Sequence, residues 1–348
     1  MHFGDSLLAD SALIAQPPLV SVIIATYNRP NYLRHAIKSV LNGVYQNFEI
    51  VVSDDSASPA TQQLTESFQD PRIRYRCNQK RLGSAGNHRE AVKMAAGKYI
   101  GLLNDDDEWE SDFLYRLVPI MTSHPEVVIA FTDHWVIDSQ GNIQIKATEE
   151  CTHRFKRDGL AAGLHWPFYK LALIDQSIPM VASLLRTSDL EWDDTPLESS
   201  SIYDFWVTYL AARTHKGAWY VPERLARYRV HDRNQTAGGS LVKPAIYVYS
   251  RLLADDRLAE LRPELLSRLR QVHFGYATLL LKQGLAKDAR RHLWAAGPNF
   301  RVFGAMCLSY VPAVLRSLVL SASPGQSGEQ PIASGTYPNR RSSDLSAL

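Results

Sequence analysis

Short β-branched runs alternate with helical segments from residue 19 to residue 103, and this alternation is the feature that most constrains the fold. Runs such as Leu19–Ala25 have the composition of buried strands. Strands that alternate with helices predict βαβ units, hence an α/β protein with a mixed, mostly parallel sheet flanked by helices. The expected strands are 19–25, 48–53, 72–76 and 98–103, and the expected helices are 31–42, 59–69 and 86–96.

The remaining chain divides into three parts. Two further helices and two extended runs precede a mostly helical segment with twelve Lys and Arg against five Asp and Glu, at 243–320. The end is rich in Ser, Gly, Pro and Asn, which predicts disorder. The helices are expected at 111–123 and 201–213, and the extended runs at 126–138 and 218–230. The first extended run is expected to be a strand pair with a turn at 139–142. The expected division is a leader (1–18), a catalytic domain (19–235), a C-terminal helical extension (236–321) and a disordered tail (322–348).

Charge and cysteine content exclude several classes of protein. Lys and Arg number 38 against 36 Asp and Glu, so no basic footprint for nucleic acid is present. The three scattered cysteines form no CxxC or Cys/His cluster, which argues against a disulfide framework and a structural zinc site. No basic segment precedes a long apolar run at the N-terminus, and no stretch of 18 or more apolar residues lacks a charge. We therefore expect a cytoplasmic protein with neither a secretion signal nor a spanning helix.

Polar clusters follow three of the expected strands. In open α/β sheets, ligands bind beyond the carboxyl ends of the strands, so these clusters are expected to converge. Three adjacent carboxylates repel one another unless solvent or a divalent cation compensates them, and Mg²⁺ or Mn²⁺ suits such oxygen ligands. A solvated acidic turn, or a simple turn-forming Asp pair, remains the alternative. The clusters are Thr26-Tyr27-Asn28, Asp54-Asp55 and Asp105-Asp106-Asp107.

Common nucleotide-binding and hydrolase motifs are missing from the sequence. It contains no GxGxxG, and Gly97-Lys98 lacks the upstream glycine of a P-loop because position 92 is Val. Neither HExxH nor a GxSxG elbow occurs. A dinucleotide fingerprint, a P-loop, a zincin and an α/β-hydrolase are therefore excluded.

Four segments, taken in order, resemble the family 2 glycosyltransferases, inverting enzymes of GT-A fold that use nucleotide-diphospho-sugars. The segments are 20–29, 51–56, 78–87 and 96–109, and the resemblance covers roughly residues 18–235. It implies metal-dependent, inverting transfer of a sugar from a nucleotide-diphosphate donor, preferably a UDP-sugar. The acceptor would be a hydroxyl of a saccharide or lipid-linked saccharide. The implied pathway is polysaccharide biosynthesis.

The resemblance also implies roles for individual residues. Tyr27 would lie against the nucleobase, Asp55 would accept a hydrogen bond from the base ring N–H, and Asp105 would lie near the ribose. Asp106 would hold the metal of a DxD-type motif, with Asp107 close by. His231 could complete the metal or diphosphate site. The other expected donor-binding residues are Ala25, Asn28, Asp54 and Asn87.

Inverting transfer needs a carboxylate that deprotonates the acceptor hydroxyl. Family members often carry an acid where this chain has Ile202, so Asp204 is the predicted base. Glu198, Asp193 and Asp194 are the next candidates, and a structural role for Asp204 stays open. Because this acid is missing, a catalytically inactive sugar-nucleotide-binding or scaffold protein remains an alternative. A sugar nucleotidyltransferase is a weaker rival, because no Gly-rich basic loop follows the first strand.

The C-terminal helices have a composition typical of a membrane-surface element. Basic residues are interspersed with Leu, Val, Trp and Phe, and such a helix binds anionic lipid through apolar burial and charge. The sequence thus predicts contact with the cytosolic face of a membrane, with a helical cap or a dimer interface as alternatives. The basic residues are Lys287, Arg290, Arg291, Arg301 and Arg316.

Overall fold

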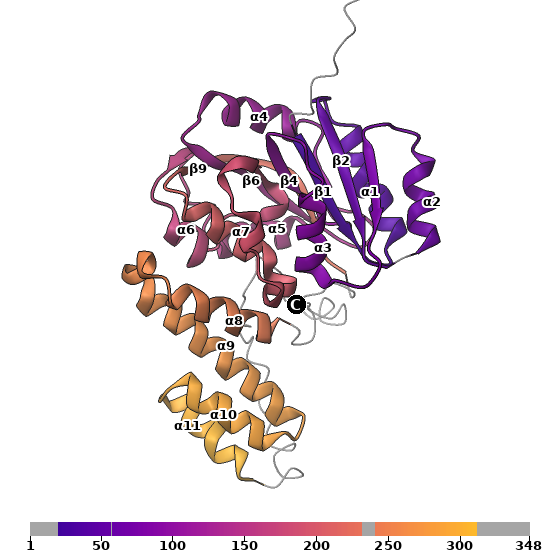
Figure 1. Cartoon of the computed structure of the whole chain (residues 1–348). Coiled ribbons are helices and arrows are strands. Elements are labelled where there is room, and N and C mark those ends of the chain that lie inside the picture. The colour runs from indigo at the N-terminus through magenta and orange to yellow at the C-terminus, as the bar shows by residue number, and fades with distance from the viewer. Residues whose placement is uncertain (1–19, 57, 232–240, 312–348) are drawn as a thin grey trace, which may run out of the picture.

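A computed structural model describes residues 20–56, 58–231 and 241–311. Within these ranges, nine strands form one sheet with helices on both faces (Figure 1). The strand order is β3-β2-β1-β4-β8-β6-β9-β5, and β7 pairs with β9 outside this path. The α/β class and the flanking helices predicted from the sequence are confirmed.

The N-terminal half of the sheet is parallel and follows the predicted alternation. β1, β2 and β3 lie side by side in chain order, and β4 pairs with the other side of β1. All four are parallel because each crossover helix returns the chain to the same end of the sheet. The expected elements are present, with boundaries shifted by a few residues. The strands are β1 (Val20–Thr26), β2 (Phe48–Asp54), β3 (Ile73–Cys77) and β4 (Tyr99–Leu102), and the helices are α1 (Pro30–Leu41), α2 (Pro59–Ser67) and α3 (Gly83–Val92).

The second half of the sheet is largely antiparallel. β8 (Ser183–Arg186) runs antiparallel between β4 and β6 (Val127–Ile137). β5 (Glu108–Trp109) and β7 (Gly163–His165) run antiparallel to β9 (Gly217–Arg229), which is itself parallel to β6. Half of the pairings among the described strands are antiparallel, but each parallel pairing is longer than any antiparallel one. The predicted mixed, mostly parallel sheet is therefore confirmed.

The predicted strand pair at 126–138 is one continuous strand. β6 pairs along its length with β9, so its hydrogen bonds are used by a distant partner rather than by a local hairpin. The turn expected at 139–142 does form, with Gly141 at a φ of 92°, but only a single bridge joins Ile137 to Ile143 beyond it. α5 (Ile145–Arg154) and α6 (Tyr169–Leu173), like β7 and β8, had no counterpart in the prediction.

Two hydrophobic cores lie on opposite faces of the sheet, because successive side chains of a strand point to opposite faces. Val22 and Ile24 of β1 pack in one core, and Ile23 packs in the other. α1 and α4 (Phe113–Ser123) cover the first face. α3, α6 and α7 (Tyr203–Ala212) cover the second.

The C-terminal helices extend from the second core. α8 (Val242–Leu253) and the first half of α9 (Arg262–Lys282) share the core of α7. The end of α9 forms a separate small core with α10 (Ala286–Ala296) and α11 (Phe300–Ser309), at the far end of the molecule in Figure 1. In the described part of the chain, no helix combines the length and hydropathy needed to cross a bilayer. The 3-10 turns are η1 (Met180–Ala182), η2 (Thr187–Asp189), η3 (Trp192–Asp194), η4 (Leu197–Ile202) and η5 (Asp256–Leu261).

Three of the predicted domain limits fall where the structure is not described. The leader 1–18, the tail 322–348 and the boundary between residues 235 and 236 lie outside the described residues. The division into domains therefore stays a prediction.

Candidate active site

Thr26, the last residue of β1, joins the three strand-end clusters. Its hydroxyl donates to Asp105 Oδ2 at 2.8 Å, and its carbonyl oxygen accepts from the backbone N–H of Asp55 at 3.0 Å. The Asn87 amide on α3 donates to the same carbonyl oxygen at 3.3 Å and to the carbonyl oxygen of Ser53 at 3.0 Å. Residues from β1, β2, α3 and the loop after β4 are thus linked at one edge of the sheet.

The acid run is interleaved with cationic and imidazole groups. Asp106 Oδ2 lies 2.7 Å from Arg29 Nη1 and 3.0 Å from His231 Nε2. Arg29 Nη1 also donates to Asp105 Oδ1 at 3.1 Å, and His231 stacks on Tyr32 with ring centroids 4.8 Å apart. Burial, reinforced by the Asp106 charge, raises the pKa of Asp105 to about 6. The structure therefore brings His231, 125 positions along the chain, against the acid run.

Asp107 anchors the acid run to β9. Its Oδ2 accepts from the Asn104 amide at 2.7 Å, and its Oδ1 accepts from the backbone N–H of Arg229 at 2.8 Å. The side chain is almost fully buried, and burial raises its pKa well above the usual range. The Arg229 guanidinium in turn donates to the Asp106 carbonyl oxygen at 2.8 Å and pairs with Glu108. Asp107 is consequently placed to position the loop.

A divalent cation would find a partial ligand set here. Across the described ranges, no three His, Cys, Asp or Glu side chains are grouped as ready metal ligands. Asp106 and His231 nevertheless place a carboxylate oxygen and an imidazole nitrogen 3.0 Å apart. Mg²⁺ and similar ions usually take one or two protein carboxylates and complete their shell with phosphate oxygens and water. The residues present fit a cation whose remaining ligands come from a diphosphate.

Asp55 holds the start of α3. Its Oδ1 accepts from the backbone N–H of Leu82 at 2.8 Å and from the Asn78 amide at 3.2 Å, and its Oδ2 accepts from the N–H of Gly83 at 2.8 Å. Gly83 has a φ of 75°, a conformation that favours glycine. The Asp55 carboxylate therefore caps a helix and supports the loop that leads into it.

Removing the Asp55 carboxylate should destabilise this edge of the sheet. We expect Asp55→Ala to lower the free energy of unfolding by about 1–3 kcal/mol, because two backbone N–H groups and one side-chain amide lose a buried acceptor. Asp55→Asn, which keeps one acceptor oxygen, should lose less. Urea unfolding at constant m-value measures both. An unchanged midpoint for Asp55→Ala would contradict the capping role.

The other predicted donor-binding residues lie around this edge. Tyr27 is 36% exposed, and the Arg81 guanidinium lies over its ring at 4.1 Å from the centroid. Asn28 follows with a φ of 55°, and Ala25 is half-buried in β1. Asp54 points into the protein, where it accepts from the backbone N–H of Ser56 at 2.8 Å and from the Tyr75 hydroxyl at 3.0 Å. Tyr27 is thus partly exposed, with Arg81 over its ring, whereas Asp54 supports the turn.

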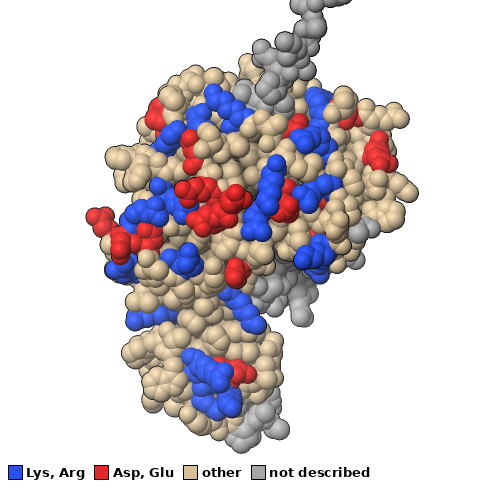
Figure 2. Space-filling view, in the orientation of Figure 1, with Lys and Arg blue, Asp and Glu red and all other residues tan. Residues whose placement is uncertain are grey.

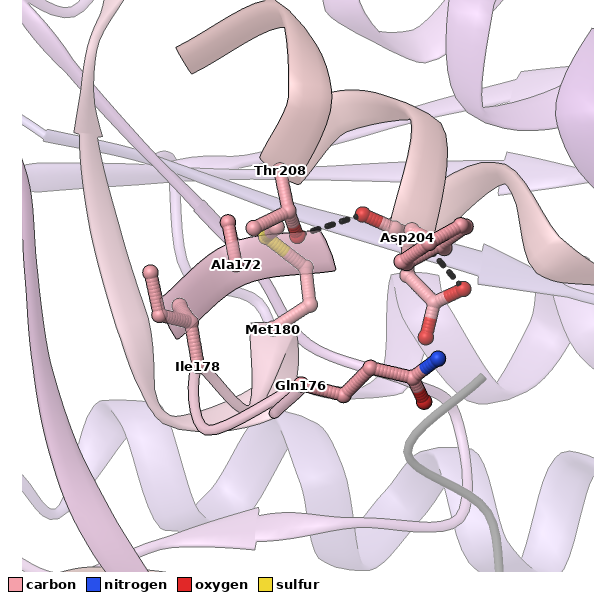
Figure 3. A pocket seen from close by; sticks show the side chains of 7 residues that line it. Ala172, Gln176, Ile178, Met180, Asp204 and Thr208 are labelled. Carbon is pink, nitrogen blue, oxygen red and sulfur yellow. Dashed lines mark hydrogen bonds between the residues drawn. The ribbon is translucent and has the colours of Figure 1, made fainter. Parts of the chain in front are cut away.

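Asp204 lies in the first turn of α7, beside a small hollow (Figure 3). Its Oδ1 accepts from the backbone N–H of Phe205 at 2.8 Å, and the carboxylate points toward the Gln176 amide. Burial raises the pKa of Asp204 to about 6, which suits a general base. The hollow has a cavity volume of about 10 Å³, room for about one water molecule and not for a sugar. Its lining residues are Ala172, Gln176, Ile178, Met180, Asp204, Phe205 and Thr208.

Tyr203, which precedes Asp204 in α7, is within reach of the charges of both Asp204 and the acid run. Its ring stacks on His88 with centroids 3.8 Å apart, and its pKa is raised well above the usual value by burial and then by the charges of Asp204 and of residues 105–107. Ile202 has a hydrocarbon side chain and is fully buried, so position 202 supplies no proton acceptor. Tyr203 and His88 were not anticipated, because an aromatic pair from two distant helices leaves no local pattern in the sequence.

The alternative bases differ in their surroundings. Glu198, Asp193 and Asp194 are all exposed on the η3–η4 segment. Asp194 pairs with Arg213 at 2.7 Å. An exposed carboxylate lacks the desolvation that would raise its proton affinity, so the surroundings favour Asp204 as base.

Trp109 packs inside the protein. Its indole N–H donates to the Val181 carbonyl oxygen at 2.7 Å, and the ring lies against Gly101, where a Cβ atom would come within 2.5 Å of it. Gly101 is required by this close approach. Trp109 therefore fixes β5 against β4 and is not available to stack on a sugar.

Comparison with known proteins identifies the family to which this chain belongs. The model of the family "Glycosyl transferase family 2" matches residues 21–177. An uncharacterized glycosyltransferase of Methanocaldococcus jannaschii is 30% identical over 236 residues, which are 67% of this chain and 77% of that protein. The chain belongs to glycosyl transferase family 2.

Further similarities concern lipid-linked sugars and the fold. A GalNAc(5)-diNAcBac-PP-undecaprenol beta-1,3-glucosyltransferase of Campylobacter jejuni is 33% identical over 161 residues, 44% of this chain and 51% of that protein. This chain therefore matches only about half of that relative's length. The crystal structure of S. aureus TarS 1-349 in complex with UDP-GlcNAc has a TM-score of 0.61 at 16% identity, covering 86% of this chain and 88% of that one. The fold is thus that of GT-A glycosyltransferases, and the chain is a transferase.

Proposed function

We propose that the protein transfers a sugar, with inversion, from a UDP-sugar to a hydroxyl of a lipid-linked saccharide, and that the reaction requires Mn²⁺ or Mg²⁺. The observation that carries this proposal is the junction at Thr26, where the β1 end, the helix-capping Asp55 and the acid run meet. A neighbour of the same fold binds UDP-GlcNAc, and another, a mannosyltransferase of Pyrobaculum calidifontis with a TM-score of 0.50, is a complex with GDP-Man and Mn²⁺.

In the proposed reaction, the acceptor hydroxyl loses its proton to Asp204 as its oxygen attacks the anomeric carbon. The bond between that carbon and the diphosphate breaks, and its electron pair leaves with the nucleoside diphosphate. A bound cation would stabilise the negative charge that develops on the diphosphate. Asp106 and His231 would hold that cation, while Asp107 would keep the loop in place. Tyr27 would lie against the nucleobase of the donor. Asp105, Asn28 and Asn87 would hold the rest of the donor-binding edge in place.

The proposed acceptor places the reaction at a membrane. The relative from C. jejuni is named for an undecaprenol-linked acceptor, and a second relative, from Escherichia coli, is named as a diphosphoundecaprenol beta-1,3-glucosyltransferase with 36% identity over 103 residues. A lipid-linked saccharide stays at the bilayer surface, so the proposed transfer would take place there. We place it at the cytosolic face, in polysaccharide biosynthesis.

A thermal-shift screen tests the donor and the metal together. We expect UDP with Mn²⁺ to raise the melting temperature by roughly 5 °C at saturating concentration, because a ligand that binds only the folded state stabilises it by mass action. UDP or Mn²⁺ alone should give a much smaller shift. GDP, ADP and TDP serve as matched controls for the identity of the nucleobase. A larger response to another diphosphate would correct the donor, and no response to any of them would refute the proposal.

A further inference from the structure

The largest apolar side chains of α10 and α11 lie in solvent. Phe300 is 90% exposed, Trp294 79%, Tyr310 73% and Phe303 69%. These are the four highest exposed fractions among the large apolar side chains of the described residues, and all four lie within 17 consecutive positions. Large exposed apolar patches mark interaction sites.

The exposed residues of α11 form one stripe. Phe300, Phe303, Cys307 and Tyr310 follow one another at helical spacing, and all are exposed. The opposite stripe, at Val302, Ala305 and Ser309, is buried. The helix is therefore apolar on two sides, and only one of them packs within the protein.

The small core beneath these helices is built from smaller residues than those left outside it. It consists mainly of alanine and leucine and contains no fully buried aromatic side chain. Folding for stability alone would favour the opposite arrangement, with Phe and Trp inside, because burial of apolar area is the main favourable term. The exposed aromatic residues thus need a partner outside this core. The core residues are Ala277, Leu280, Leu281, Ala289, Leu293, Ala296, Val302 and Ala305.

Basic side chains border the aromatic residues. On α10, Lys287 and Arg291 are exposed about two turns and one turn before Trp294, and on α11 Arg301 is exposed beside Phe300. Arg290 lies over the Tyr310 ring at 4.7 Å, which connects the two helices. Figure 2 shows Lys and Arg side chains gathered on the C-terminal helices beside a smaller acidic group. In the part of α10 and α11 that is described, Asp288 is the sole acidic residue.

We propose that this surface, formed by Lys287, Arg291, Trp294, Phe300, Phe303 and Tyr310, docks on an anionic lipid bilayer. Aromatic side chains prefer the level of the lipid headgroups, and Lys and Arg are attracted to anionic lipid. The inference rests on exposure and charge at α10 and α11, so it stands or falls separately from the proposed reaction. It makes specific the membrane contact that the sequence predicts for the C-terminal helices.

Vesicle flotation with the full chain tests the docking surface. We expect the protein to float with vesicles of about three parts phosphatidylcholine to one part phosphatidylglycerol, and to float weakly with phosphatidylcholine alone. Phe300→Ser combined with Phe303→Ser should reduce partitioning by about tenfold or more. Arg291→Glu should also weaken it, and added salt should weaken the wild-type protein. Tyr115→Ser, which alters a 57% exposed aromatic residue on α4, is the matched control and should leave partitioning unchanged.

A fluorescent probe reports which surface enters the lipid. Cys307 lies on the exposed stripe, Cys77 is the other exposed cysteine of the described chain, and Cys151 is buried. A polarity-sensitive dye on Cys307 of a Cys77→Ser variant should shift to the blue with anionic vesicles. The same dye on Cys77 of a Cys307→Ser variant should not shift.

Three results would overturn the proposal. One is the absence of flotation with anionic vesicles, and another is equal flotation by the double variant. The third is a dimer, measured by light scattering, that the double variant converts to a monomer while vesicle binding is absent, because the surface would then join two copies of the chain. Donor-induced thermal shifts in the double variant should match the wild type, which separates failure here from failure of the proposed reaction.

Discussion

Replacing Asp204 with asparagine is expected to lower the rate of sugar transfer by about 10²–10⁴-fold, the usual contribution of a general base. The amide keeps the size of the carboxylate and can still accept from the Phe205 N–H at the start of α7. It cannot take a proton from an acceptor hydroxyl. Initial rates of nucleoside diphosphate release in the presence of acceptor measure the effect, and the thermal shift with UDP and Mn²⁺ should be retained.

Glu198→Gln is the matched control for this loss. Glu198 is an exposed carboxylate on η4, six positions before Asp204, and its conversion to an amide should leave the rate within about twofold of the wild type. A rate that falls with Glu198→Gln and survives Asp204→Asn would exchange the two roles. A wild-type chain that binds donor and transfers nothing to any acceptor would favour a sugar-nucleotide-binding protein, and release of pyrophosphate would indicate a nucleotidyltransferase.

The pH dependence gives an independent reading of the same residue. Burial raises the pKa of Asp204 to about 6, so the base is ionised above that pH and protonated below it. The wild-type kcat/KM should therefore fall as the pH is lowered through about 6. Asp105, whose pKa is also raised to about 6, could produce a similar limb. In Asp204→Asn the limb should vanish from the residual rate if Asp204 causes it, and should persist if Asp105 does.

The sequence predicts the parallel half of the sheet well because its signals are local. Each β-branched run from β1 to β4 is flanked by its own turn and helix, so hydrophobic period and composition are sufficient to predict these strands and helices. β8, by contrast, is a four-residue strand that enters antiparallel between β4 and β6. Its partners lie far away in the chain, and no local pattern reports them. The antiparallel part of the sheet begins at that insertion, and its position could not be predicted from periodicity.

The candidate site likewise has residues that the sequence could predict and contacts that it could not. Residues at strand ends, such as Asp106 and Tyr27, could be proposed from position alone because the fold brings carboxyl ends to one edge. The sequence could not show that the carboxylate oxygens of Asp55 and Asp107 accept hydrogen bonds from backbone N–H groups at the start of α3 and in β9. Nor could it reveal Arg29 between two carboxylates, since charge compensation across 76 and 77 positions depends on the tertiary structure.

Asp106→Asn is expected to abolish the Mn²⁺-dependent part of donor binding and to lower transfer by about 10²–10³-fold. The amide removes a negative charge at the one oxygen that lies next to both Arg29 and His231, and that oxygen is the proposed metal ligand. Calorimetric titration of Mn²⁺ in the presence of UDP measures the loss directly. Asp112→Asn, the same chemical change beyond the acid run, should bind Mn²⁺ as the wild type does.

The result for Asp106 decides what compensates the acid run. The Arg29 guanidinium already lies 2.7 Å from Asp106 and 3.1 Å from Asp105, so two carboxylates are partly neutralised by the chain itself. If a cation is required, it must share or replace this contact, and Asp106→Asn removes its anchor while the fold persists. If instead Asp106→Asn leaves the Mn²⁺ titration unchanged, Asp106 is not a ligand. Should UDP then bind equally well without metal, Arg29 would be the cation opposite the diphosphate, because a fixed guanidinium can pair with phosphate oxygens.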